Sequence, residues 1–440
     1  MQILPSRIPS PELKLPTQFK LPTQLKLPKG FGKRSAQNLV GLDIQPGFVA
    51  AVQARVNGSI LAERAATLAL PADSMRDGEV VDEAALSETL RELFANSGLP
   101  KRVRVGVANQ RTVLRTLELP PVTDPKELAA AVNFQAQDQV PMPLNNAVMD
   151  FHALGVVDTP AGPRQRVVLV AAQRDMIERL VKAVRQAGLS PEGVDLSAFA
   201  LIRSLYRPDP ASQGEPLARV LYLNVDGLTN LAIAEGTICR FTRVVGSGLE
   251  GMASELAERR SIALTEAREL LAQVDLTAPA PGSSSAAGAG PADGGSFEEH
   301  APAGEPVEEG EPQSTQEAEQ SERDMSYEEL AALESAPAPS GPQSDADLWT
   351  VLENGIRDIS GEVRNSLDFH RSQDGGGEVS HVVMSGRAQD IPGFAAALQA
   401  SLGVEVRCQE VGVLDGELAK SVSLHRLAVA TGLAAAEAPQ

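Results

Sequence analysis

Residues 39–47 read Leu-Val-Gly-Leu-Asp-Ile-Gln-Pro-Gly, a short apolar run that ends in turn-forming residues. Two later stretches repeat this organisation: residues 220–229 read Val-Leu-Tyr-Leu-Asn-Val-Asp-Gly-Leu-Thr, and residues 381–388 read His-Val-Val-Met-Ser-Gly-Arg-Ala. Such runs predict buried strands, and the small residues after them predict turns whose backbone N–H groups can face a phosphate. The three stretches therefore predict an α/β fold with two turns facing each other across a nucleotide cleft and a third turn beside the nucleoside.

Each turn supplies candidate ligands. The Asp43 carboxylate can hold a magnesium-bound water beside the phosphates, and Gly47 allows the backbone to approach them. Asn224 cannot act as a base, but Asp226 shares its strand face and can substitute for it. The candidate ATP-binding residues are Asp43, Gly47, Asn224, Asp226, Gly227, Thr229, Gly246, Gly248, Ser385, Gly386 and Arg387, and the candidate magnesium ligands are Asp43 and Asp226.

The same turns carry changes that weaken this chemistry. Pro46 has no N–H to offer a phosphate, and Ala50 stands where a cation on the next strand could meet phosphate charge. Arg387 either clashes with a base or clamps a phosphate, and the sequence leaves both roles open. The alternative to a nucleotide site is purely local structure, with Asp43 capping a turn and residues 226–227 forming a hairpin turn.

Charge is unevenly distributed along the 440 residues, whose formal net charge is −19. Residues 278–346 carry 15 acidic residues and one arginine, a net charge of −14, whereas residues 1–37 carry seven basic residues and one acidic residue, a net charge of +6. The remainder is mildly acidic, which argues against nucleic-acid binding by the folded part. Because residues 278–346 are rich in Pro, Gly, Ser, Ala and Glu, we predict a disordered insertion there.

The N-terminal leader, residues 1–37, contains a six-residue repeat of the type Leu-Lys-Leu-Pro-Thr-Gln. Prolines at 16, 22 and 28 exclude a continuous helix. In an extended chain the Leu and Phe side chains share one face and the lysines share the other. This basic ribbon suits an anionic membrane surface or the sheet edge of a partner; the alternative is a disordered leader without a fixed partner.

Other chemistries are not indicated. Cys239 and Cys408 are isolated and the five histidines are scattered, so neither a disulfide framework nor a zinc site is expected. No apolar run approaches the roughly 20 residues of a membrane-spanning helix and no secretion signal is present, so we expect a soluble protein that is not exported. Hydrolase motifs such as a nucleophile elbow or a zinc-protease helix are missing as well.

A strand–strand–strand–helix pattern begins at Leu39 and starts again at Val220, which predicts a duplicated two-lobed core. Helices are predicted near 82–96, 124–139, 174–186, 197–205, 347–369, 392–402 and 423–432. The predicted units are the leader 1–37, the first lobe 38–102, an inserted subdomain 103–190, a return with connector 191–219, the second lobe 220–277, the acidic insertion 278–346, the rest of the second lobe with a C-terminal helix 347–432, and a tail 433–440.

Several stretches of the sequence together carry a resemblance to a known family. Residues 133–135 read Asn-Phe-Gln and residues 140–151 read Val-Pro-Met-Pro-Leu-Asn-Asn-Ala-Val-Met-Asp-Phe. Residues 240–243 read Arg-Phe-Thr-Arg, residues 363–369 read Val-Arg-Asn-Ser-Leu-Asp-Phe, and Ser-Gly at 385 precedes Pro-Gly-Phe at 392. Together these stretches resemble the PilM family, the cytoplasmic actin-like proteins of type IV pilus assembly, which are similar to FtsA. The resemblance covers roughly residues 39–275 and 347–432.

This resemblance implies a two-lobed α/β actin-like ATPase fold: a duplicated ribonuclease-H-like core (subdomains 1A and 2A) with inserted subdomains 1C and 2B. It implies ATP and magnesium between the lobes, and a groove on the 1A/1C side that binds the N-terminal tail of the membrane protein PilN. It also implies a place in the inner-membrane assembly platform near the pilus motor ATPases, peripheral to the cytoplasmic face of the membrane.

The family's phosphate turns contain Asp-Ile-Gly, and this chain departs from them at Gln45 and Asn224; in the family's adenosine motif, Arg387 replaces a glycine. We therefore expect a scaffold with little or no ATP turnover. Two alternatives stay open: an active ATPase of the same fold, and a cytoplasmic domain of the GspL kind from type II secretion.

Overall fold

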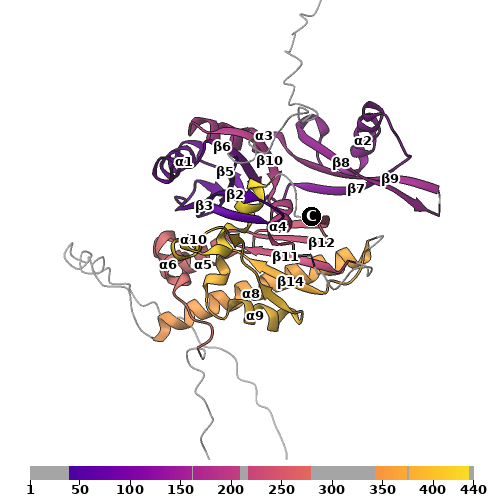
Figure 1. The fold of residues 1–440 in the computed structure, drawn as a ribbon. Coiled ribbons are helices and arrows are strands. Elements are labelled where there is room, and N and C mark those ends of the chain that lie inside the picture. Colours follow the sequence, from indigo (N-terminus) through magenta and orange to yellow (C-terminus); the bar gives the residue numbers. More distant parts are fainter. Residues whose placement is uncertain (1–38, 161, 209–216, 279–341, 374–375, 436–440) are drawn as a thin grey trace, which may run out of the picture.

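The computed structural model describes residues 39–160, 162–208, 217–278, 342–373 and 376–435. In this part of the chain two lobes are each built on a mixed β-sheet, and a smaller three-stranded subdomain extends from the first lobe (Figure 1). The predicted leader 1–37, most of the acidic insertion 278–346 and the end of the tail 433–440 lie outside the described residues.

The first lobe is centred on a sheet with strand order β10-β6-β1-β2-β3-β16. The strands are β1 (Leu39–Gln45), β2 (Phe48–Val56), β3 (Ile60–Ala69), β6 (Arg102–Val107), β10 (Ser190–Leu196) and β16 (Gly412–Val413). Both faces are apolar because helices cover both. Helices α1 (Glu83–Ser97) and α3 (Arg174–Gln186) pack on one face, and α4 (Ser197–Leu205) and α11 (Ala428–Ala434) pack on the other.

The second lobe repeats this plan with strand order β13-β12-β11-β14-β15. Its strands are β11 (Arg219–Val225), β12 (Thr229–Glu235), β13 (Ile238–Val245), β14 (His381–Ser385) and β15 (Val406–Cys408). Its helices are α5 (Leu249–Arg260), α6 (Leu264–Ala272), α8 (Pro342–Ser372) and α9 (Phe394–Leu402). Strand β11 is antiparallel to β12 and parallel to β14, just as β1 is antiparallel to β2 and parallel to β6. The predicted duplication is confirmed.

The inserted subdomain is smaller than the predicted range 103–190. Its sheet has the order β7-β9-β8, with β7 (Val113–Leu119), β8 (Ala147–Thr159) and β9 (Gly162–Gln173), and α2 (Pro125–Gln139) packs on it. The preceding strand β6 and the following helix α3 both belong to the layers of the first lobe. The reason is that their apolar faces are buried against β1 and α1 rather than against the subdomain.

The C-terminal part of the chain returns to the first lobe. The prediction that residues 347–432 form the rest of the second lobe and a C-terminal helix is therefore wrong for the part that follows β15. Strand β16 pairs with β3, and α11 packs on β1 so closely that a Cβ added at Gly41 would lie 1.9 Å from the carbonyl oxygen of Ala430. Helix α8 begins at Pro342, inside the range predicted for the acidic insertion. The short elements of this return are α10 (Gly416–Ser421) and 3₁₀ helix η5 (Leu424–Leu427), whereas the 3₁₀ helix η4 (Arg387–Asp390) follows β14 in the second lobe.

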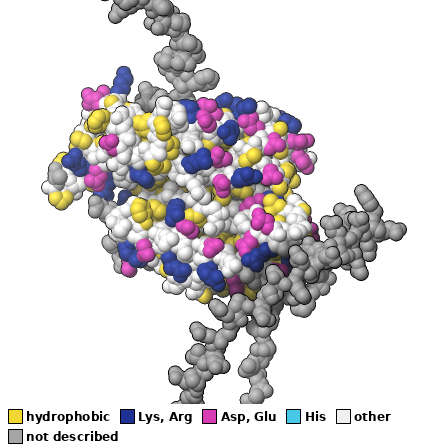
Figure 2. Space-filling model, turned by 180° about the vertical axis from the view of Figure 1, so that it is seen from behind, with side chains coloured by type: hydrophobic (Ala, Val, Ile, Leu, Met, Phe, Trp, Pro, Cys, Tyr) yellow, Lys and Arg dark blue, Asp and Glu magenta, His cyan; other side chains and the backbone are white. Residues whose placement is uncertain are grey.

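Acidic and basic side chains are interspersed on the face shown in Figure 2, and no large basic patch gathers there. Such mixing is typical of a solvated surface rather than of a nucleic-acid-binding one. Among the helices that the structure describes, none combines the length and the apolar composition needed to cross a bilayer.

Candidate functional site

The turns that follow β1 and β11 lie against each other in the crevice between the lobes. In the first turn Gly47 adopts a left-handed φ of 79°, which glycine tolerates without steric cost. In the second turn, a Cβ added at Gly227 would lie 2.5 Å from the carbonyl oxygen of Pro46. The backbones of the two turns are therefore in contact at this point, with no room for another group between them.

Asp43 and Asp226 form one electrostatic site beneath these turns. Both carboxyl groups are almost fully buried, at 2% and 1% exposure, and Asp43 accepts a hydrogen bond of 3.0 Å from Nε2 of Gln45. Burial, followed by the charge of Asp226, raises the pKa of Asp43 to about 7, although the hydrogen bond from Gln45 and the charge of Arg387 oppose the rise. A positive charge beside two buried carboxyl groups that repel each other stabilises their ionised forms.

Arg387 supplies that positive charge. Its Nε is ion-paired with Asp226, its Nη2 donates to the carbonyl oxygen of Pro46 at 3.3 Å, and its Cζ lies 5.2 Å from the ring centre of Phe48. Gly386 allows this placement: its φ is 98°, and an added Cβ would lie 2.4 Å from a backbone carbonyl oxygen of β11. The sequence left two roles open for Arg387, a clash with a base and a clamp on a phosphate. The structure shows a different arrangement, in which the guanidinium points at the two turns and its partners are protein groups.

The other polar residues predicted for the site hydrogen-bond within the second lobe. Asn224 accepts a hydrogen bond of 2.9 Å from the Ser385 hydroxyl through Oδ1, and this bond joins the ends of β11 and β14. The Thr229 hydroxyl donates to the carbonyl oxygen of Ser247 at 2.5 Å. Asn224 and Ser385 are both buried, so this pair stabilises the sheet edge below the crevice.

The predicted glycines bring the start of α5 against the second turn. A Cβ at Gly248 would lie 2.4 Å from the carbonyl oxygen of Gly227, and Gly246 faces Gln110 of the first lobe, with an added Cβ 3.1 Å from its Nε2. The first N–H groups of α5 donate to the carbonyl oxygens of Asp226 and Gly227, at 2.8 and 3.3 Å. These donors at a helix N-terminus would otherwise be available to an anion.

Sequence reasoning missed two ion pairs beside the turns. Arg268 of α6 pairs with Glu250 of α5 and donates through Nη1 to the carbonyl oxygen of Leu70 in the first lobe at 3.4 Å. Asp390 of η4 accepts from Nε of Arg426 at 2.6 Å. With Arg387 they line a cavity of about 290 Å³ next to Phe48 and Leu249. No spacing in the sequence indicates these pairs, because their partners come from different elements.

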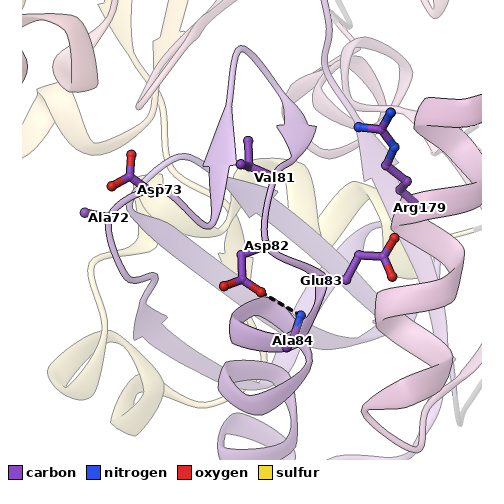
Figure 3. A pocket seen from close by; sticks show the side chains of 7 residues that line it. All are labelled: Ala72, Asp73, Val81, Asp82, Glu83, Ala84 and Arg179. Atoms are coloured by element: carbon purple, nitrogen blue, oxygen red, sulfur yellow. Dashed lines mark hydrogen bonds between the residues drawn. The ribbon is translucent and has the colours of Figure 1, made fainter.

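A second candidate site is an open groove on the first lobe, of about 690 Å³ (Figure 3). It lies between the segment 72–84, which contains the hairpin β4–β5 (Met75–Arg76 and Glu79–Val80), and helix α3. The side chains that line it are Ala72, Asp73, Val81, Asp82, Glu83, Ala84 and Arg179. Glu79 of the hairpin also pairs with Arg111 at 3.1 Å, which connects this edge to the start of the inserted subdomain.

The groove combines carboxylates with one exposed apolar side chain. Val81 is 55% exposed. Asp82 caps α1 by accepting from the N–H groups of Ala84 and Ala85, and Glu83 pairs with Lys182 of α3 at 2.6 Å. The cap and the ion pair therefore fix the polar side chains of the groove, while the side chain of Val81 is open to solvent.

Comparison with known proteins identifies the family to which this chain belongs. A family model described as type IV pilus assembly protein PilM matches residues 41–267, just over half of the chain. The chain belongs to the PilM family. A solved structure described as a PilM–PilN type IV pilus biogenesis complex is similar, with a TM-score of 0.63 and 20% identity over 90% of this chain and 97% of that chain. The ethanolamine utilization protein EutJ of Carboxydothermus hydrogenoformans aligns more weakly, with a TM-score of 0.44 and 14% identity over 90% of this chain and 88% of that chain.

The duplicated lobes and this likeness confirm the two-lobed actin-like fold that the sequence predicted for a PilM-family protein. The residues at the phosphate turns, in contrast, do not fit a triphosphate in the arrangement observed. Pro46 has no N–H, the first donors of α5 bond to the second turn, and Asp226 is paired with Arg387. Among the described residues, no set of three or more His, Cys, Asp or Glu side chains is placed to hold a metal ion.

Proposed function

We propose that this chain is the PilM-like scaffold of a type IV pilus inner-membrane assembly platform, and that it binds the N-terminal cytoplasmic tail of a PilN-like membrane protein. The observation that carries the proposal is the family match over residues 41–267, which includes both the groove and the inter-lobe turns. In this role the chain is cytoplasmic, peripheral at the inner face of the membrane, and contacts the motor ATPases only indirectly.

The groove beside α3 is the proposed tail site. It lies on the first lobe beside α3 and presents Val81 among carboxylates, and Glu79 of its hairpin pairs with Arg111, just before the inserted subdomain. An extended tail with apolar and basic side chains would cover Val81 and lie near Asp73, whose side chain is exposed. Binding of this kind needs area and charge complementarity and no catalytic group.

The inter-lobe crevice supports a scaffold better than an enzyme. Phosphoryl transfer depends on metal-bridged phosphates and donors that are free to cradle them, whereas here the turns contact each other and their polar groups are paired internally. We therefore propose that nucleotide is not needed for tail binding. The competing function, an active actin-like ATPase, predicts steady phosphate release with magnesium ATP that Asp43→Ala abolishes.

The test is calorimetric titration of a synthetic PilN-like N-terminal tail peptide from the same organism into the full chain. Val81→Asp should weaken binding at least fourfold, because covering the exposed half of a valine is worth about 0.8 kcal/mol and the new carboxylate adds desolvation. The matched control is Val56→Asp, whose side chain is 49% exposed on β2 outside the groove.

A second matched pair of variants tests the contribution of the acidic groove side chains to peptide binding. Asp73 and Asp368 are exposed aspartates, each ion-paired with an arginine three residues away. Asp73→Asn should weaken binding about twofold at low salt, whereas Asp368→Asn, on α8 of the second lobe, should not change it. Equal affinities of Val81→Asp and Val56→Asp for the peptide would show that the tail binds outside the groove. Failure of the wild-type chain to bind the peptide would contradict the proposed function.

A further inference from the structure

Arg387 connects the two lobes through contacts that need no ligand. It belongs to η4 of the second lobe, and Asp226 of the same lobe fixes its guanidinium through an ion pair. From there it reaches the first lobe, donating to the carbonyl oxygen of Pro46 at 3.3 Å and lying 5.2 Å from the ring centre of Phe48. Its side chain is only 15% exposed, so both interactions are largely protected from water.

Two neighbouring ion pairs also hold the lobes together. The pair Arg268–Glu250 lies against the first turn, where a Cβ added at Gly47 would be 3.0 Å from Cζ of Arg268. Asp390, three residues after Arg387, accepts from Arg426 in the segment that leads back to the first lobe. The closed arrangement of the lobes is thus held on both sides of Arg387 by groups of the chain itself.

The charges explain why Arg387 is suited to this position. Two buried carboxyl groups, Asp43 and Asp226, lie beneath the turns, and a cation beside such a pair stabilises its ionised forms. A soluble cation leaves when the lobes open, whereas a guanidinium is covalently attached and always charged. Arg387 also offers several donors in a plane, so it can pair with Asp226 and reach Pro46 at once.

We propose that Arg387 is an internal latch that holds the two lobes closed in place of a nucleotide. The latch rests on the part of the proposed function in which tail binding needs no nucleotide, and it goes beyond tail binding because it sets the angle between the lobes. Such a latch keeps the chain in a single closed state at every nucleotide concentration, so the groove is presented continuously to its partner.

The test is amide hydrogen exchange of the full chain, followed by mass spectrometry of peptides that cover residues 44–50 and 225–230. In Arg387→Gln, exchange in both peptides should rise at least about tenfold, because the turns separate more often. Arg387→Lys keeps the charge but not the planar set of donors, and should give an intermediate rise. The matched control is Arg371→Gln, an arginine of the second lobe that pairs with Asp368 on the surface.

A second variant leaves Arg387 in place. Phe48→Leu removes the ring under the guanidinium and keeps an apolar side chain, so exchange in the same two peptides should rise, by less than in Arg387→Gln. Circular dichroism and exchange of the inserted subdomain, residues 113–173, establish that each variant is folded. Unchanged exchange at both turns in a folded Arg387→Gln would overturn the latch.

Two further measurements distinguish the latch from a phosphate clamp and from the tail site. Magnesium ATP at 1 mM should not change exchange at the turns of the wild-type chain; protection that appears in the wild type and is lost in Arg387→Gln would make Arg387 a phosphate clamp and overturn the proposal. The PilN-like tail peptide should bind Arg387→Gln within about twofold of the wild type. Failure of the wild type to bind that peptide would refute tail binding, while the exchange result would still decide the latch.

Discussion

Replacing Asp43 by asparagine should stabilise the protein, and more so as the pH rises. Asp43 lies at the end of β1 with 2% of its surface exposed. Burial first, and the neighbouring charge of Asp226 second, raise its pKa from 3.8 to about 7. Asparagine keeps an oxygen that can accept the hydrogen bond from Gln45, and it removes the ionisation.

The size of the change in unfolding free energy follows from the pKa of Asp43 in the folded state and its pKa in the unfolded state. Because the folded-state pKa lies above the unfolded-state pKa, the stability associated with the protonated carboxyl is complete below pH 3.8 and is lost as the pH rises to about 7. The full loss corresponds to about 4 kcal/mol, of which about 2.5 kcal/mol develops between pH 5 and pH 8. At about 1.5 °C per kcal/mol for a folded part of this size, the difference in Tm between Asp43→Asn and wild type should grow by about 4 °C over that interval.

Thermal unfolding at pH 5, 6, 7 and 8, in EDTA and without nucleotide, measures this growth. Comparing the pH dependence of the two proteins, rather than one Tm with another, cancels any packing difference between Asp and Asn. Asp368→Asn, which removes an exposed carboxyl on α8, is the control and should follow the wild type at every pH. A Tm difference for Asp43→Asn that stays constant from pH 5 to pH 8 would refute the reasoning, because Asp43 would then be ionised throughout.

Three further outcomes are expected. Leu433→Ala, in the fully buried face of α11, should cost about 3 kcal/mol of unfolding free energy in urea titration, whereas Leu414→Ala, at an exposed position, should cost less than about 1 kcal/mol. Gly386→Ala should lower the Tm by several degrees, because a Cβ there would lie 2.4 Å from a carbonyl oxygen and φ is 98°. Iodoacetamide at pH 8 should label the exposed Cys408 and spare Cys239, since burial raises the pKa of the Cys239 thiol to about 12; mass spectrometry distinguishes the two.

Local signals allowed much of the fold to be predicted. Helix α3 was predicted at 174–186, its observed range, because apolar residues recur at helical spacing and Gly188 follows its end. Helix α2 begins as expected from Asp124 and Pro125, where the Asp124 side chain accepts from the backbone and proline occupies the first turn. Each of these elements is specified by residues within a few positions of its ends.

Elements that depend on distant partners escaped prediction. Strand β10 contains Pro191 and Gly193, which read as a loop, yet it pairs with β6 at the sheet edge through an irregular register. Strand β16 has only two residues and exists because β3, far away in the sequence, offers it an edge. The same limit applies to Arg387: the sequence placed it in the right motif, but the direction of its side chain is set by Asp226 and Phe48.

Two of the changes at the phosphate turns, Pro46 and Asn224, are accompanied by internal hydrogen bonds. Pro46 gives up an N–H donor, and its carbonyl oxygen then accepts from the Arg387 guanidinium. Asn224 replaces an acid, and its amide oxygen accepts from Ser385 at the sheet edge without adding a third buried charge. A site that had only lost its ligand would leave unpaired charges and donors at these positions, at a cost of several kcal/mol. Instead, the polar groups at these positions have internal partners, as the proposed latch requires.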